Sequence, residues 1–374
     1  MGPLRGIRVL EVAGQGPGPF AAMVLADLGA EVIRVERPNA PGIKDAVARS
    51  RRILRLDLKK ADGVRVFLRL AASSDALIEV FRPGTMERLG LGPQDCLAAN
   101  PALIYGRMTG WGQDGPYAQA PGHDINYIAL AGVLAHLGRA GGPPAPPLNL
   151  LGDYGGGGML LAVGILAALV ETARSGQGQV IDAAMVDGSA LLMTFAWSLR
   201  HSGQLGGPRG TNILDSGAPY YDAYECADGA YISVGSVEPH FYDELLKVTG
   251  LDGDPLMAGQ HDRSRWPEQK RRLSEAIRRR TSREWREAME NAQVCFAPVL
   301  DMAEAARHPH NVARGTFVEV DGMTQPAPAP RFSRTTLDGP QTPRQGTDET
   351  RAILADAGCT TEEIQSLIES GTAR

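Results

Sequence analysis

The fold class can be read from residues 7–35, IRVLEVAGQGPGPFAAMVLADLGAEVIRV. A short apolar run at 7–12 predicts a buried strand, and apolar residues recur at helical spacing over 20–28 before Gly29. A second apolar run at 31–35 follows. Strand, helix and strand in this order form a βαβ unit, so we expect a parallel sheet with a right-handed crossover.

The same alternation continues along the first half of the chain and predicts a doubly wound, Rossmann-like α/β layer. Further helices are expected at 57–73, 86–99 and 155–173, and further strands at 76–81, 102–108 and 178–182.

The character of the sequence changes after about residue 205. Alternating aromatic and β-branched residues at 220–226 and 230–234 are separated by Ala227-Asp228-Gly229, which predicts a β-hairpin. Charged helices are expected from about 265 to 290. These elements indicate a smaller α+β domain at 215–300.

The composition excludes several classes of protein. The 374 residues are 43% hydrophobic and 22% charged, as in ordinary globular proteins, and a net charge of −5 argues against non-specific nucleic-acid binding. The longest apolar run, 159–170, is shorter than the roughly 20 residues of a spanning helix, so no membrane insertion is expected. The four cysteines are far apart and form no CxxC pair, which favours a reducing, cytoplasmic location.

The turn after the first strand resembles a dinucleotide-binding fingerprint but departs from it. Gly14-x-Gly16 opens a helix, and Glu36 ends the next strand. Pro19 stands where the third glycine belongs, and Pro17 and Pro19 lack the N–H groups that a pyrophosphate would bind. We therefore expect no nicotinamide cofactor, and interpret the segment as a tight turn able to line a pocket for another ligand.

Three titratable residues are candidates for chemistry. His123 and Asp153 each lie beside a glycine, which lets backbone amides approach a substrate. The glycines at 155–158 are expected to open the following helix, whose free N–H groups would stabilise an oxyanion. Glu238, before Pro239, could orient a base. The alternatives are a surface or core histidine and two helix N-caps.

Basic residues gather in the first 90 positions although the chain is acidic. Ligands of open α/β sheets bind at the carboxyl ends of the strands, and a phosphate-rich ligand would need such groups there. A solvated basic face is the alternative interpretation. The residues are Arg34, Arg37, Arg49, Arg51, Arg52, Arg55, Lys59, Lys60, Arg82 and Arg88.

From end to end the sequence resembles the CaiB/BaiF superfamily, which comprises family III CoA-transferases and 2-methylacyl-CoA racemases. The resemblance is greatest to bacterial, mycobacterial-type racemases. It rests on Pro3–Val9, Gly29–Pro38, Leu56–Lys59, Arg82–Gly84, Glu87–Gly92, Gly110–Gln113, Gly122–Tyr127 and Pro219–Gly229. Gly122-His123-Asp124 favours the racemase branch, because transferases usually carry an aromatic residue after that glycine.

The resemblance implies a racemase that interconverts (2R)- and (2S)-2-methylacyl-CoA thioesters. His123 and Asp153 would be the two acid/base residues, and Glu238 would pair with the histidine. The N–H of Asp124 or Gly152 would stabilise the enolate, with no metal and no cofactor, since CoA is part of the substrate. The alternative within the family is a CoA-transferase in which Asp153 is the nucleophile.

The resemblance also implies the CoA contacts and the architecture. A large CoA-binding domain would be built from both chain ends, 1–205 and 301–374, the latter ending in a helix. With the small domain at 215–300 it would form an interlocked homodimer. The CoA contacts would be Arg37, Leu56, Asp57, Leu58, Lys59, Val80, Phe81, Arg82, Arg88, Gly122, Asp124, Ile125, Asn126 and Tyr127.

Overall fold

A computed structural model describes residues 2–41 and 45–374 of the chain. The described chain divides into two compact units. The first comprises the residues up to Gly132 together with Pro147–Leu192 and Gly315–Arg374, and the second comprises Val133–Pro146 and Met193–Arg314. The first unit is therefore assembled from three separate parts of the sequence, including both of its ends.

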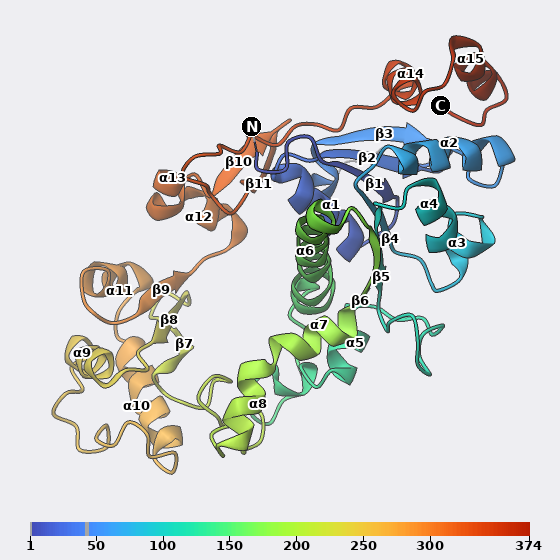
Figure 1. Ribbon diagram of the computed structural model, residues 1–374. Coiled ribbons are helices and arrows are strands. Elements are labelled where there is room, and N and C mark those ends of the chain that lie inside the picture. The colour runs from blue at the N-terminus through green and yellow to red at the C-terminus, as the bar shows by residue number, and fades with distance from the viewer. Residues whose placement is uncertain (1, 42–44) are drawn as a thin grey trace. The chain divides into compact units, whose positions relative to one another are not determined.

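A six-stranded, all-parallel sheet forms the centre of the first unit (Figure 1), as the βαβ pattern predicts. Its order is β3-β2-β1-β4-β5-β6, so the chain reverses its direction of winding between β1 and β4. Such a reversal places a crevice at the carboxyl ends of those two strands. The strands are β1 (Arg8–Val12), β2 (Glu31–Glu36), β3 (Arg51–Arg55), β4 (Ala76–Glu79), β5 (Ile104–Thr109) and β6 (Gln179–Ala184).

Helices cover both faces of this sheet, because successive strand residues point to opposite faces. Val9 belongs to a core that includes residues of α1 (Pro17–Asp27) and α6 (Leu160–Ser175). Leu10 belongs to the other core. That core includes residues of α2 (Ala61–Ala72), α4 (Pro93–Ala99), α14 (Thr347–Asp356) and α15 (Thr361–Glu369). Shorter elements of this unit are η1 (Ala46–Ala48), α3 (Thr85–Arg88), α5 (Asp124–Leu130), α7 (Met185–Leu192), β10 (Phe317–Val320) and β11 (Met323–Pro326).

Strand β3 has no counterpart among the expected strands, because three of its five residues are arginines. The side chain of Arg51 is fully buried and forms an ion pair with Glu11 of β1. Arg52 forms ion pairs with Glu31 and Glu349. The arginines of β3 make it resemble a solvent-exposed segment in the sequence. In the structure their charges are neutralised by carboxylates that are distant in the sequence.

The C-terminal segment returns to the open edge of β3. Ile53 N–H donates to Arg344 O at 2.8 Å, and Arg374 N–H donates to Arg55 O at 3.0 Å. Beyond the strand, Asp57 N–H donates to Thr372 O at 2.8 Å. The last 31 or so residues therefore cover this edge, and they form two helices where one was expected.

The apolar helix begins earlier than predicted. A π-helix, η3 (Leu150–Met159), leads directly into α6, so the glycines at 155–158 lie inside a helix and do not open it. A methyl group on Gly156 would lie 2.6 Å from Ser189 N, and one on Gly158 would lie 2.5 Å from Pro17 O. These glycines permit close helix packing, and the expected role of their N–H groups in stabilising an oxyanion does not hold.

The combined helix, 26 residues from Leu150 to Ser175, is long and apolar enough to cross a membrane by length and composition. This corrects the sequence-based estimate, which counted only the apolar run 159–170. The core helix of a globular unit passes the same test, and Leu161, Ile165 and Ala168 are buried in the core of the first unit.

The second unit contains the predicted hairpin. Strands β7 (Tyr221–Glu225), β8 (Tyr231–Gly235) and β9 (Phe296–Val299) form an antiparallel sheet over a core that includes Tyr220 and Trp285. Its helices are η2 (Leu134–His136), α8 (Thr194–His201), α9 (Pro239–Thr249), α10 (Trp266–Ile277), α11 (Ser282–Met289), α12 (Met302–Arg307) and α13 (Pro309–Arg314).

The boundaries of the second unit differ from those expected for the small domain. It extends over 193–314 and includes the distant segment 133–146. Arg139 of that segment forms an ion pair with Asp222, and Arg209 donates a hydrogen bond to Ala135 O at 3.1 Å. Such contacts between distant segments cannot be read from local composition.

Candidate active site

Asp153 lies in the π-helix η3, with its carboxylate against the turn that follows β1. A methyl group on Gly16 would lie only 3.0 Å from Asp153 Oδ2, and Gly16 has a left-handed backbone with φ of +69°. The amide of Asn149 donates a hydrogen bond to the same carboxylate oxygen at 3.1 Å. The glycine turn that resembles a dinucleotide fingerprint thus forms a wall of the Asp153 site.

His123 occupies the N-cap position of α5 and is exposed, and its backbone N–H donates to Asn126 Oδ1 at 3.0 Å. The next residue, Asp124, is buried. Its Oδ2 accepts a hydrogen bond from the backbone N–H of Asp153 at 2.7 Å. Asp124 therefore ties the start of the helix that carries His123 to the helix that carries Asp153.

The electrostatics of Asp153 reflect this arrangement. Burial raises the pKa of its carboxyl group. The Asn149 hydrogen bond lowers that pKa, the negative charge of Asp124 raises it, and the positive charge of His123 lowers it, with a net increase. The structure thus brings His123 and Asp153 into one electrostatic environment. A carboxyl group with a raised pKa is suited to proton transfer near neutral pH.

The loop before His123 is anchored by an aromatic pair. The Tyr127 hydroxyl donates a hydrogen bond to Gly122 O, and a methyl group on Gly122 would lie 2.7 Å from the Tyr127 ring. Trp111 packs edge-on against Tyr127, with 4.7 Å between the ring centroids. Burial, followed by the negative charge of Asp153, raises the pKa of Tyr127.

Two backbone N–H groups were expected to stabilise an oxyanion. Asp124 is the first residue of α5, where N–H groups lack partners within the helix. Gly152 lies in the first turn of η3, and a methyl group on it would lie 2.6 Å from Asp124 Oδ2. Both candidate donors therefore come from the two helix starts that Asp124 joins.

The expected CoA-binding residues follow the carboxyl ends of neighbouring strands. Arg37 comes after β2, residues 56–59 come after β3, and 80–82 come after β4. The positive charge of Arg82 lowers the pKa of Tyr127, which places Arg82 close to the His123 loop. The side chain of Leu56 is not available to a ligand, because it is 1% exposed and packs in the core.

The other expected contacts lie on α3 and α5. Arg88 is exposed at the end of α3 and donates a hydrogen bond to Thr85 Oγ1 at 3.0 Å. Ile125 and Asn126 are exposed in the first turn of α5. These side chains have surface available for a ligand.

Glu238 belongs to the second unit, whereas His123 and Asp153 belong to the first. It is exposed at the N-cap position of α9, with Pro239 in the first turn, but its side chain makes no capping hydrogen bond. Burial, and then the negative charge of Glu238, raise the pKa of the Cys295 thiol, so this carboxylate lies close to Cys295.

Sequence reasoning missed Asn149 as part of the Asp153 site, and it expected the turn at Gly16 to line a pocket without connecting that turn to Asp153. Asn149 precedes Asp153 by four residues, a spacing that places two side chains on one face of a helix. That signal was not visible because the helix was expected to begin at residue 155. In residues 2–41 and 45–374, no group of three His, Cys, Asp or Glu side chains is arranged to hold a metal ion.

The chain is similar to known proteins over nearly its whole length. Residues 4–349 match the family described as CoA-transferase family III. The chain is 47% identical over 368 residues to the alpha-methylacyl-CoA racemase of Mus musculus, covering 97% of this chain and 96% of that protein. The alpha-methylacyl-CoA racemase of Homo sapiens is 44% identical over 374 residues, with 97% and 96% covered.

The fold is also similar to that of solved structures. The crystal structure of a CaiB/BaiF family protein from Brucella suis superposes with a TM-score of 0.81 at 26% identity, covering 95% of this chain and 99% of that chain. The family model, the relatives and the solved structure all belong to the same family. The chain belongs to CoA-transferase family III.

Proposed function

We propose that this protein is a racemase that interconverts (2R)- and (2S)-2-methylacyl-CoA thioesters. The observation that carries the proposal is the juxtaposition of His123 and Asp153, with Asp124 joining the two helices that bear them. Relatives named alpha-methylacyl-CoA racemase match over nearly their whole length. Inversion at a carbon requires an acid and a base on opposite faces, and two different side chains provide them.

The proposed reaction begins with removal of the proton on the carbon next to the thioester carbonyl. His123 takes this proton from one epimer. The electron pair of the broken C–H bond forms a C=C bond to the carbonyl carbon, and the π pair of the C=O bond moves to the oxygen to give an enolate. The N–H group of Asp124 or of Gly152 stabilises that oxygen. Asp153, protonated beforehand, delivers a proton to the opposite face, and the roles reverse in the other direction.

CoA is part of the substrate in this scheme, so no separate cofactor or metal ion is invoked. Its phosphates would be bound by basic side chains after β2, β3 and β4, at the crevice between β1 and β4. The residues proposed to hold the CoA moiety through side chain or backbone are those of the expected set, with Leu56 contributing its backbone only.

We propose that the protein acts as a homodimer, in which Glu238 orients His123 within or across subunits. Large apolar side chains are exposed on both units and would be covered by association, and contiguous groups of them mark interaction surfaces. Strand β6 is also an open sheet edge with Val180 exposed. The exposed residues include Met159, Val163 and Val170 on α6, and Phe195 and Trp197 on α8. Sedimentation equilibrium tests this directly, and a monomer at micromolar concentration would contradict it.

A cytoplasmic location is part of the proposal. All four cysteines are free, and three of them are buried. Free thiols persist in a reducing compartment. Fractionation of the native cells, with immunodetection of the protein, tests the location.

The test of the reaction uses one epimer of a 2-methylacyl-CoA in D₂O, with NMR to follow the α-proton. Exchange accompanied by the other epimer supports the racemase. His123→Ala and Asp153→Asn should both abolish epimerisation, whereas His310→Ala and Asp252→Asn, at exposed positions, should not. Absence of exchange, with CoA transfer to an added carboxylate, would replace the racemase by a CoA-transferase that uses Asp153 as its nucleophile.

A further inference from the structure

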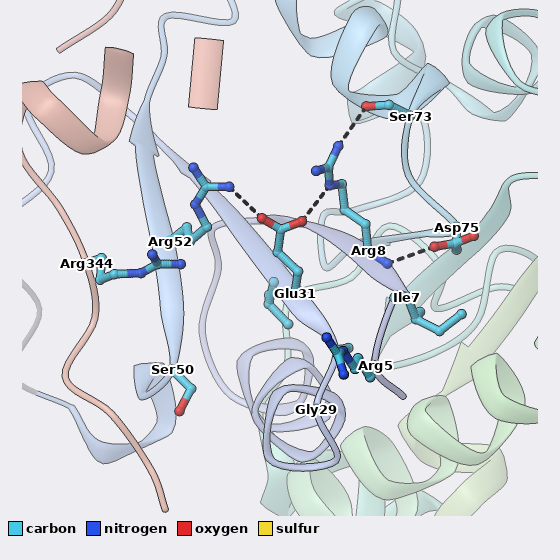
Figure 2. A pocket seen from close by; sticks show the side chains of 13 residues that line it. Arg5, Ile7, Arg8, Gly29, Glu31, Ser50, Arg52, Ser73, Asp75 and Arg344 are labelled. Atoms are coloured by element: carbon cyan, nitrogen blue, oxygen red, sulfur yellow. Dashed lines mark hydrogen bonds and ion pairs between the residues drawn. The ribbon is translucent and has the colours of Figure 1, made fainter. Parts of the chain in front are cut away.

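A cavity lies at the end of the same sheet opposite the Asp153 site. Its volume is about 690 Å³, and it is lined by residues at the amino ends of β1, β2 and β3 (Figure 2). The Asp153 site adjoins the carboxyl end of β1, which is five residues long. At about 3.3 Å per residue, roughly 16 Å of strand separates the two ends. The cavity is therefore distinct from the proposed catalytic site.

Two of the four arginines that line this cavity are already neutralised. Arg8 Nε donates to Glu31 Oε2 at 2.7 Å, and Arg52 donates to Glu31 Oε1. Burial raises the pKa of Glu31, but the hydrogen bonds and charges of these two arginines outweigh burial and lower it. Arg52 also forms ion pairs with Glu349 and Asp356. The role of this group is to hold the sheet together.

The other two lining arginines, Arg5 and Arg344, have no such partners. Among the residues that the structure describes, neither guanidinium has a hydrogen bond or ion pair. In Figure 2 dashed lines reach Glu31 from both sides, and none reaches Arg5 or Arg344. The lining contains four arginines and two carboxylates, Glu31 and Asp75. Since carboxylates already neutralise Arg8 and Arg52, the charges left to meet a ligand are those of Arg5 and Arg344, which are both exposed.

The sheet topology separates the two chain segments that carry these arginines. Arg344 is bridged to Arg52 of β3, and β2 lies between β3 and β1. Arg5 belongs to the segment that leads into β1. Three strand spacings of about 4.8 Å put roughly 14 Å between the backbone of Arg344 and that of β1.

We propose that this cavity binds a small molecule with two separated anionic groups, one held by Arg5 and one by Arg344. A planar guanidinium pairs in bidentate fashion with a carboxylate or a phosphate, and the two sources share this chemistry. The cavity volume lies within the range of about 300–1,000 Å³ typical of small-molecule sites. Ser50 and the ion-paired Glu31 also line the cavity.

Isothermal titration calorimetry on the full-length protein tests the site with two probes, glutarate and fructose 1,6-bisphosphate. We expect saturable binding of at least one probe with a stoichiometry of one per chain. The probe that binds identifies carboxylate or phosphate as the preferred group. The double variant R5A/R344A should weaken binding by at least about tenfold, since a hydrogen bond to a charged group is worth on the order of that factor.

The matched control is R174A/R279A, which removes the same charge at two exposed positions outside the cavity and should leave binding unchanged. All titrations are repeated with excess CoA, because the proposed CoA site is separate and binding should persist. Three outcomes would overturn the proposal: no saturable binding of either probe, equal binding by R5A/R344A, or loss of binding when CoA is present. Retained epimerase activity of R5A/R344A would confirm that the variant is folded.

Discussion

The contact between Gly16 and Asp153 allows a catalytic position to be tested without touching a titratable group. In Gly16→Ala the new methyl group would lie 3.0 Å from Asp153 Oδ2, whereas ordinary van der Waals contact begins at 3.4 Å. The carboxylate must therefore retreat by about 0.4 Å. Misplacement of a catalytic group by 1 Å can cost roughly 100-fold in rate, so this displacement should lower kcat by roughly five- to tenfold.

The chain offers a matched control for the backbone. Gly90 has the same φ of +69°, and a methyl group on it would meet nothing within 4 Å. Both substitutions should destabilise the protein by about 1–2 kcal/mol, which is the cost of a left-handed conformation for an L-residue. Urea unfolding measures that loss, and α-proton exchange in D₂O measures the activity. The reasoning is refuted if Gly16→Ala keeps more than half of wild-type activity, or if Gly90→Ala loses as much.

Three further predictions concern charge. Asp124→Asn removes a negative charge that raises the pKa of Asp153. In the direction in which Asp153 is the base, the acidic limb of the pH–rate profile should therefore move to lower pH, and an unmoved limb would mean that Asp124 is not coupled to the reacting groups. Because the pKa of Asp153 is raised on folding, ionising it disfavours the folded state as pH rises through the folded pKa. Asp153→Asn should therefore unfold at a higher temperature than wild type at pH 7, and the difference should vanish below the unfolded pKa of about 3.9. Glu11→Gln leaves Arg34 and Arg51 without their shared buried carboxylate, and urea unfolding should show a loss of about 3–5 kcal/mol; a loss below 1 kcal/mol would contradict a buried ion-pair role.

The sheet was predictable where local pattern and final environment agree. The apolar runs that became β1 and β2 are buried on both faces, as strands covered by helices must be. Strand β3 was not predictable, because the burial of Arg51 depends on Glu11, which lies 40 residues away. The same reason explains the helix start at Leu150: glycine favours a break in isolation, but close contact with α7 favours the helix.

The sequence indicates titratable candidates for the site, but not how the helices that carry them are held together. Glycine neighbours singled out His123 and Asp153. The hydrogen bond that connects their two helices runs from Asp153 N–H to the Asp124 carboxylate. These two residues lie 29 positions apart in the sequence, and no local pattern signals the bond. Asn149 was missed because the helix that follows it was expected to begin only at residue 155. Chemistry-bearing residue types are visible in a sequence, whereas the contacts that orient them exist only after folding.

The return of the chain to the edge of β3 sets an order of events during synthesis. The second unit ends at Arg314, so its residues leave the ribosome before the segment that covers β3. At about 5–20 residues per second, the final 60 residues take roughly 3–12 s to be made. During that interval the nascent sheet carries an unpaired edge, and Arg51, Arg52 and Arg55 on that strand oppose its pairing with another nascent chain.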